Sequence, residues 1–164
     1  MIILGIDPGL ATMGWGVIET DGQRLKMIQY GTLGTPAGQP MPVRLRAIFE
    51  GVKQLIAMFK PDEIAFEELF FSRNVTTALA VGAARGVALV AASQHTEALY
   101  EYTPMQIKQA VVGYGKADKH QVQNMVRILL NLKEIPRPDD AADGLAAAIT
   151  HAHSMAQRHL FKIQ

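Results

Sequence analysis

The chain has 164 residues, of which 49% are hydrophobic and 19% are charged, and its formal net charge is +1. This length and composition suit one domain with a buried core, and the small charge does not by itself indicate a nucleic-acid-binding protein. The absence of cysteine excludes a disulfide scaffold and a thiolate metal site, and it fits a reducing, cytoplasmic compartment. We find no signal peptide and no apolar run long enough to cross a bilayer, so we expect a soluble protein without a membrane partner.

The pattern of apolar residues predicts an N-terminal group of three strands, followed by alternating helices and strands. Asp21-Gly22 is a hairpin turn signal between the second and third strands. Pairs of cap residues mark the beginnings of two later helices. The expected strands are Met1–Asp7, Met13–Thr20, Gln23–Leu33, Glu63–Glu67 and Ala98–Tyr102; the expected helices are Leu45–Phe59, Val75–Ser93, Pro104 to about Gly113, Asp118–Lys133 and a last helix from about Pro138.

This order, β-β-β-α-β-α-β-α-α-α, predicts a single α/β domain over residues 1–164, with a five-stranded mixed sheet flanked by helices. The hairpin would be antiparallel, and the helical crossovers would make parallel pairs. If the first strand lies beside the fourth, Asp7 and Glu67 end neighbouring strands. Open α/β sheets bind their ligands at the carboxyl ends of such strands, so we expect the functional site there.

Acidic side chains stand at the ends of these two strands. Asp7 ends the first strand, although an Asp before Pro-Gly is also a common turn residue. Glu67 ends the fourth strand and is followed by Glu68. Strand alternation favours Glu67 as the inward-facing acid, because it shares a face with the small Ala65 whereas Glu68 shares one with the bulky Phe66.

The last predicted helix begins with DDAADG, which offers two ways to place acids on one face. Asp140 and Asp143 are three residues apart and Asp139 and Asp143 are four apart, so spacing alone leaves Asp139 and Asp140 as alternatives. Acids also favour the positive end of a helix dipole, which is an ordinary structural reason for the first two. Asp143 is harder to explain in that way, because it lies in an alanine-rich stretch that looks buried.

Four acids at one edge of a sheet would repel one another strongly unless cations compensate their charge. Oxygen ligands without a His or Cys cluster suit Mg²⁺ or Mn²⁺. Two such ions about 4 Å apart can stabilise the attacking and the leaving oxygen of a phosphoryl transfer. The acids therefore predict a metal-dependent phosphoryl-transfer site.

The segments GIDPG, FEELFFSRN, ARGVAL, QIKQAVVGYGKADKHQVQ and DDAADGLAAAITH follow one another in this order. Together they resemble the RuvC family of bacterial Holliday-junction resolvases, in the RNase H-like nuclease superfamily, over nearly the whole chain. The resemblance implies an RNase H-like fold and a homodimer that cuts four-way junction DNA during recombination and repair. It implies two Mg²⁺ per active site, with Mn²⁺ as a substitute, and a partnership with the RuvA and RuvB branch-migration proteins. It assigns the catalytic and metal-binding roles to Asp7, Glu67, Asp140 and Asp143.

Basic residues gather between residues 105 and 133, where five lysines and arginines and one acid give a local charge of +4. A local basic patch suffices for contacts to DNA phosphates. The resemblance implies that Lys108 and Lys119 support the active site or the phosphates, and Lys116 lies in a Gly-rich segment that we expect to meet DNA. Each lysine alone is equally well explained as a solvated surface charge.

Further DNA-binding candidates follow the fourth strand. The resemblance favours Phe70 as an aromatic side chain that stacks on a base at the open junction centre, with core packing as the alternative. Arg73 and Asn74 are expected to contact the DNA backbone nearby. In the last helix, His151 is a candidate to support the metal site, and a hydrogen-bonded core histidine is the alternative. The glycines of VGAARG would make a flat helix face for a dimer contact or for internal packing.

Three other functions fit the sequence less well. A related RNase H-like nuclease acting on RNA–DNA hybrids would share the acids, but the junction-specific segments argue against it. The GIDPG segment also resembles the phosphate-binding hairpin of actin-like and sugar-kinase ATPases, which need a duplicated domain that 164 residues cannot hold. A nuclease-inactive DNA-binding module is disfavoured because all four acids are present.

Overall fold

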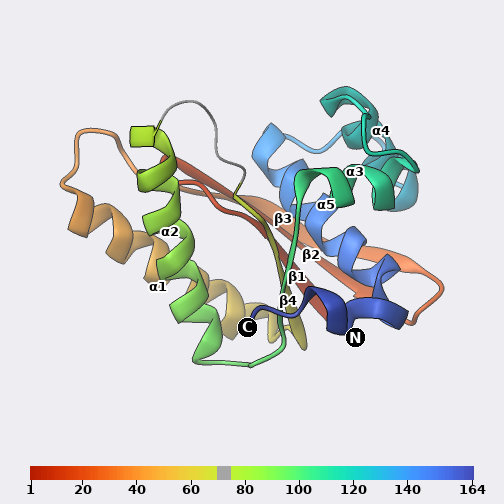
Figure 1. Cartoon of the computed structure of the whole chain (residues 1–164), viewed down its shortest axis with the longest axis horizontal. Helices are drawn as coiled ribbons and strands as arrows, with labels where there is room; N and C mark the ends of the chain where they lie inside the picture. Colours follow the sequence, from red (N-terminus) through yellow and green to blue (C-terminus); the bar gives the residue numbers. More distant parts are fainter. Residues whose placement is uncertain (70–74) are drawn as a thin grey trace.

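The computed structural model describes residues 1–69 and 75–164, which form three layers with a sheet between two groups of helices (Figure 1). The strands of the sheet are β1 (Ile2–Asp7), β2 (Thr12–Thr20), β3 (Leu25–Gly34), β4 (Glu63–Glu67) and β5 (Leu99–Tyr102). Their order is β3-β2-β1-β4-β5. Because β1 pairs antiparallel with β2 and parallel with β4, the predicted mixed sheet and the neighbouring places of the first and fourth strands are confirmed.

The helices divide between the two faces of the sheet, as Figure 1 shows. One layer contains α1 (Met41–Phe59) and α2 (Val75–Ser93), and the other contains α3 (Pro104–Val112), α4 (Lys119–Leu129) and α5 (Asp139–His153), followed by the short 3₁₀ helix η1 (Met155–Phe161). The predicted order of strands and helices is confirmed. The bounds of the fourth strand and of the second helix agree with the prediction residue for residue.

Several boundaries differ from the prediction for local reasons. Helix α1 begins at Met41 rather than near Leu45, because Pro42 falls in the first turn, where its missing N–H is not needed. Helix α4 ends at Leu129 rather than Lys133. Asn131 adopts a left-handed backbone conformation with φ of 52°, which stops the helix. The last predicted helix is shorter than expected and continues as η1.

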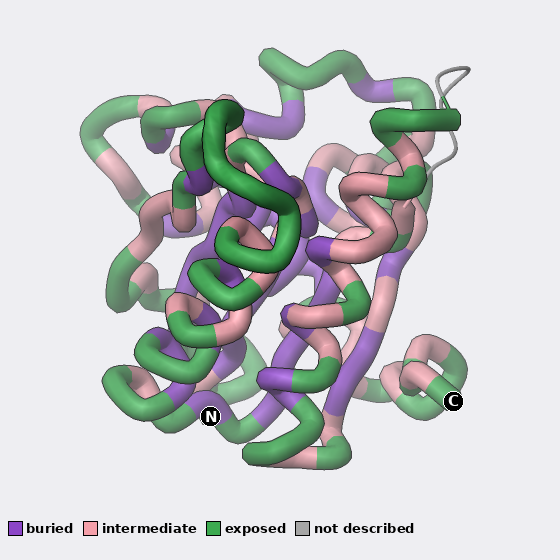
Figure 2. Tube along the Cα trace, turned by 90° about the vertical axis from the view of Figure 1, so that its left-hand side faces the viewer, coloured by how far each residue is buried: buried purple, intermediate pink, exposed green. Residues whose placement is uncertain are grey.

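Alternation along β1 separates two apolar cores, one under each helical layer. Leu4 and Ile6 pack with the α1–α2 layer, whereas Ile3 packs with the layer of α3, α4 and α5. In Figure 2 the buried segments run through the middle of the molecule, with exposed segments around them. Asp7 shares the face of Ile3, and the same alternation in β4 gives Glu67 this face as well. Both acids therefore point toward the layer that contains α5.

Helix α5 lies directly on β1 and β2 because small residues allow a close approach. A Cβ added to Gly14 in β2 would lie 1.7 Å from the backbone oxygen of Asp140, and one added to Gly144 would lie 2.6 Å from the Cα of Trp15. Larger residues at these two positions would push the helix away from the sheet. The glycines thus fix the first turns of α5, which contain Asp140 and Asp143, over the end of β1.

Helix α2 is apolar enough to need a separate explanation. Its length and its mean hydropathy of 1.7 would allow it to cross a membrane, and 22% of the segment is buried. By length and composition, the expectation that no apolar run is long enough to cross a bilayer is therefore wrong. In the fold, α2 packs against α1 and gives Ala84 and Ala88 to the core. Its outer side is the α2 stripe, which we define as Val75, Leu79, Gly86 and Val90, all exposed.

Candidate active site

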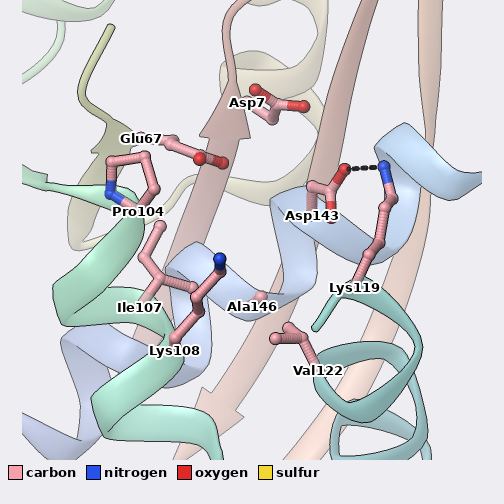
Figure 3. A pocket seen from close by; sticks show the side chains of 9 residues that line it. All are labelled: Asp7, Glu67, Pro104, Ile107, Lys108, Lys119, Val122, Asp143 and Ala146. Carbon is pink, nitrogen blue, oxygen red and sulfur yellow. Dashed lines mark hydrogen bonds and ion pairs between the residues drawn. The ribbon is translucent and has the colours of Figure 1, made fainter. Parts of the chain in front are cut away.

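The two strand-end acids are neighbours in the sheet. Ile6 of β1 pairs with Phe66 of β4, and Asp7 and Glu67 are the next residues of these two parallel strands. Together with Asp143 of α5 they surround a hollow of about 280 Å³, which Figure 3 shows from close by. Its lining residues are Asp7, Glu67, Pro104, Ile107, Lys108, Lys119, Val122, Asp143 and Ala146. The sheet end that the sequence predicted as the functional site therefore carries a hollow rimmed by acids.

Burial and mutual repulsion make these acids hard to ionise. The pKa of Asp7 is raised to about 8. Burial is the main cause, and the negative charges of Glu67, Asp143 and Asp140 add to it. Burial is also the main cause that raises the pKa of Glu67 to about 7, with the charge of Asp143 second. The pKa of Asp143 is raised by burial as well, against the opposing effect of Lys119. Such a group of acids favours a compensating cation at neutral pH.

Two lysines supply positive charge to the hollow. Lys119 Nζ donates a hydrogen bond to Asp143 Oδ2 at 2.9 Å, the dashed line in Figure 3. Partial burial opposes the charged form of Lys119, but the hydrogen bond and charge of Asp143 outweigh it and raise the pKa of the lysine. Lys108 of α3 lines the same hollow, and its charge lowers the pKa of Glu67. Both lysines therefore lie in the same hollow as the acids, and their role there stays a prediction.

The start of α4 explains why Lys119 has this position. Lys119 is the first residue of the helix and follows the cap residue Asp118. Asp118 Oδ1 accepts a hydrogen bond from the backbone N–H of Gln121 at 2.9 Å, and Gln121 Oε1 accepts one from the N–H of Asp118, also at 2.9 Å. This reciprocal pair fixes where the helix begins. It therefore fixes the backbone position of Lys119, from which the side chain reaches Asp143.

The structure separates the two acids that helix spacing left as alternatives. Asp139 pairs with the guanidinium of Arg137 in the segment before α5. Asp140 instead lies close enough to Asp7 for its charge to raise the pKa of that acid. Asp140 lines a second hollow beside the first rather than the one in Figure 3. Of the two, Asp140 is thus the acid that acts electrostatically on Asp7.

The donor chemistry around Asp7 fits a hard divalent cation, because the side chains that gather there are carboxylates. In residues 1–69 and 75–164, however, no three His, Asp or Glu side chains converge closely enough to form a ready ligand cluster. The acids instead stand around the hollow, and Lys119 provides the cation next to Asp143. The residue types suit Mg²⁺ or Mn²⁺.

His151 lies away from these acids, which corrects the expectation that it supports a metal site. Its ring is completely buried, with Nδ1 at 2.8 Å from the hydroxyl of Tyr102 and Nε2 at 2.5 Å from Glu63 Oε2. Glu63 is the first residue of β4, at the opposite end of the strand from Glu67. Because both ring nitrogens have partners there, the alternative of a hydrogen-bonded core histidine describes His151.

The remaining DNA-binding candidates are only partly placed. Phe70, Arg73 and Asn74 lie outside the described residues, so their roles stay predictions. Lys116 is exposed between α3 and α4, next to Gly115, which lines a further hollow together with Lys108. The lysine is therefore open to solvent, in a segment that reaches the hollow beside Lys108.

Sequence reasoning did not predict the second hollow or the basic residue in it. The hollow is lined by Gly9, Leu10, Ala11, Thr12, Arg44, Thr76, Thr77, Ala80, Val81 and Asp140. Arg44 lies in the first turns of α1, and its side chain bonds to Thr35. A basic residue near the start of an amphipathic helix is ordinary on a surface, so the sequence offered no signal to single it out.

Comparisons with known proteins agree over nearly the full chain. A family model described as Crossover junction endodeoxyribonuclease RuvC matches residues 3–151. Proteins of that name from Rubrobacter xylanophilus and Alkaliphilus oremlandii are 60% and 53% identical, covering 93% and 100% of this chain and 86% and 100% of theirs. The solved structure of T. thermophilus RuvC in complex with Holliday junction substrate is 40% identical and covers 99% of this chain and 98% of that chain, with a TM-score of 0.91. The expected RNase H-like fold is confirmed by this match.

Proposed function

The chain belongs to the RuvC family of crossover junction endodeoxyribonucleases, and we propose that it resolves four-way (Holliday) DNA junctions. It acts as a structure-selective endonuclease that makes paired symmetric nicks in recombination and repair. The observation that carries the proposal is that three acids and two lysines, from five different elements, line one hollow at the ends of β1 and β4 (Figure 3).

The proposed cofactor is Mg²⁺, with two ions per active site and Mn²⁺ as a substitute. Asp7, Glu67, Asp140 and Asp143 would hold it, since their oxygens are the ligands that hard cations prefer. When bound, such ions supply Lewis-acid stabilisation of the attacking and leaving oxygens in phosphodiester hydrolysis. The raised pKa values of Asp7 and Glu67 support the proposal, because a nearby divalent cation would favour their ionised forms.

The chain's own cations prepare the hollow for a phosphate. Lys119 is held on Asp143, and the amine of Lys108 lies nearer to Glu67, so the two lysines reach the acids from different helices (Figure 3). We infer that they attract the scissile phosphate and offset the repulsion between its negative charge and the acids. Neither lysine needs to act as a nucleophile, because water attack requires no covalent intermediate.

Junction selectivity is assigned to residues near the end of β4 and between α3 and α4. We propose that Phe70 stacks on a base at the open junction centre, while Arg73, Asn74 and Lys116 contact the DNA backbone. The exposure of Lys116 supports its part of the proposal. The other three assignments rest on the family resemblance.

We infer that the active form is a homodimer whose subunits meet through the α2 stripe. Val75 and Leu79 are 70% and 71% exposed, which is unusual for large apolar side chains on one helix face. A Cβ added to Gly86 would meet nothing within 4 Å, so packing inside the subunit does not require this glycine. The one charged residue of the helix, Arg85, pairs with Glu101 of β5 and leaves the stripe uncharged.

A twofold contact along α2 would relate the two hollows by symmetry, as paired nicks in a symmetric junction require. Leu79→Arg should therefore give a monomer in sedimentation experiments and uncouple the two nicks. Met58→Arg is the matched control, since Met58 is also exposed but belongs to α1. A dimeric Leu79→Arg variant that still makes paired nicks would contradict the interface.

Other partners and the location of the protein follow from the family alone. We propose cooperation with the RuvA and RuvB branch-migration proteins and a cytoplasmic location. The absence of cysteine is compatible with that compartment.

The deciding experiment compares a labelled four-way junction with linear duplex and an RNA–DNA hybrid, each with Mg²⁺ and with a chelator. Paired symmetric nicks on the junction alone, and only with Mg²⁺, are expected. Cleavage of the hybrid or duplex instead would assign the acids to another substrate. Junction binding without any cleavage by the homodimer would overturn the nuclease assignment.

A further inference from the structure

A second hollow of about 510 Å³ lies at the same end of the sheet, toward the other helical layer. The first hollow is lined from α3, α4 and α5, whereas the second is lined by the β1–β2 turn, by α1 and α2, and by Asp140. Asp140 links the two, because it lines the second hollow and its charge acts on Asp7 in the first. A DNA strand with one phosphate at the acids has further phosphates on either side of it, and the second hollow adjoins the first through Asp140.

Arg44 is the basic residue that lines this second hollow. Its Nε donates to Thr35 Oγ1 at 2.9 Å, and one of its terminal nitrogens donates to the backbone oxygen of Thr35 at 3.4 Å. The Thr35 hydroxyl in turn donates to the backbone oxygen of Leu10 in the β1–β2 turn. The guanidinium is thus held in a fixed orientation by a buried threonine.

The charge of Arg44 remains uncompensated within the part of the chain that the structure describes. No carboxylate there forms an ion pair with Arg44, although Asp140 lines the same hollow. Thr35 occupies only the Nε side and one terminal nitrogen, which leaves guanidinium N–H groups for a ligand. A planar, oriented guanidinium with unused donors is suited to bind a phosphate.

We propose that the second hollow binds a backbone phosphate of the DNA strand whose scissile phosphate lies at the acids, with Arg44 as its cation. This inference rests on the proposed junction-cleaving function. A free anion would be repelled by Asp140, whereas a phosphate of the bound strand is delivered by the rest of that strand. The small side chains of Gly9, Ala11 and Ala80 leave room for a DNA backbone against the wall of the hollow.

The matched test compares Arg44→Gln with Arg46→Gln, which makes the same charge change on the same helix at an exposed residue. Junction affinity is measured in chelator, where no cleavage is expected, over a range of salt concentrations. Each lost phosphate contact reduces the slope of log K against log[salt] by about 0.9. We expect this reduction and about ten-fold weaker binding for Arg44→Gln. Arg46→Gln should retain the wild-type slope.

A second measurement identifies the phosphate and separates binding from a role in folding alone. Junctions carry single uncharged methylphosphonates at successive positions around the cleavage site. Wild-type protein should lose affinity at one flanking position, and Arg44→Gln should be insensitive at that same position. Arg44→Met also removes the charge and serves in both measurements if the Gln variant does not fold. Arg44→Lys keeps a charge without the planar fork, so it should retain the salt slope.

The outcomes distinguish this inference from the proposed function. An unchanged salt slope, together with wild-type sensitivity to every methylphosphonate in a folded variant that lacks the Arg44 charge, would overturn the phosphate site while the wild-type protein still nicks junctions. Wild-type protein that neither binds nor nicks junctions would instead overturn the proposed function.

Discussion

The two ends of β4 carry two glutamates on the same face of the sheet, and their surroundings are opposite. Glu63 meets the ring of His151 at 2.5 Å, and Arg158 lies 3.5 Å away. Glu67, four residues on, faces Asp7 and Asp143, and its pKa is raised to about 7. Glu63 therefore contacts two basic side chains, whereas Glu67 lies close to other carboxylates.

This difference separates a structural acid from a candidate catalytic acid. The Glu63 end also holds the C-terminal segment against the sheet, because Arg158 of η1 pairs with Glu63. The other ring nitrogen of His151 contacts the Tyr102 hydroxyl of β5. Burial lowers the pKa of His151, although the charge of Glu63 opposes this. At the Glu67 end, the burial and mutual repulsion of the acids lower the stability of the metal-free protein. Variants at the two ends should therefore affect stability and cleavage in opposite ways.

The largest effect is expected from the acids of α5. Asp143→Asn should reduce cleavage by about a thousand-fold or more while keeping junction binding, because it removes a proposed ligand and leaves the basic surface. Asp140→Asn should behave in the same way. Asp139→Asn is the matched control and should cut at nearly the wild-type rate, since Asp139 pairs with Arg137. Single-turnover cleavage of a labelled junction measures all three, and full activity of Asp143→Asn would contradict the site.

A smaller loss of cleavage is expected at the lysine that contacts Asp143. Lys119→Met should slow cleavage about ten- to a hundred-fold, because the hollow loses a cation fixed at 2.9 Å from the acid. Lys116→Met removes the same charge from an exposed residue three positions earlier and should mainly weaken junction binding. Equal effects of the two variants on the single-turnover rate would show that Lys119 contributes only general positive charge.

At the other end of β4, the change should appear in stability rather than in chemistry. Glu63→Ala leaves the buried ring of His151 without its partner and should cost about 1–3 kcal/mol of unfolding free energy in urea titrations. The folded variant should keep wild-type cleavage. Glu67→Gln is the counterpart and should lose cleavage without losing stability in metal-free buffer. A Glu63→Ala variant that folds normally but cannot cut would place this end in the active site as well.

Much of this arrangement was predictable from sequence because it depends on local patterns. Period-2 alternation favoured Glu67 as the inward-facing acid. The order of elements allowed the first strand to lie beside the fourth, and the parallel β1–β4 pair of the structure meets that condition and makes Asp7 and Glu67 neighbours. Helix spacing fitted both Asp139 and Asp140, and only the family resemblance favoured Asp140. Arg137, two residues before Asp139, was its partner, and nothing in the spacing indicated that.

Contacts between residues far apart in the sequence were not predictable. His151 and Glu63 are 88 residues apart, and the sequence could not show which end of β4 the histidine would reach. The same applies to Arg44, whose importance depends on Thr35 and on the hollow beside Asp140. The length of α1 was underestimated because the helix was predicted to begin at Leu45, after Pro42, although proline is accepted in a first helical turn.

The smallest effect, and the one that tests the contrast most directly, is the pH dependence of stability in metal-free buffer. Asp7 has a folded pKa of about 8 against an ordinary value of 3.8, so between these values the folded chain holds a proton that the unfolded chain has released. Stability should therefore fall as the pH rises through this window. Asp7→Asn should flatten the fall and raise the melting temperature at pH 8 by about 3 °C or more. Mg²⁺ should stabilise the wild-type protein at that pH and have little effect on Asp7→Asn. Thermal melts that instead show wild-type stability rising from pH 5 to pH 8 without metal would contradict this expectation. The acids at this end would then not repel one another in the folded protein, and the contrast between Glu67 and Glu63 would be lost.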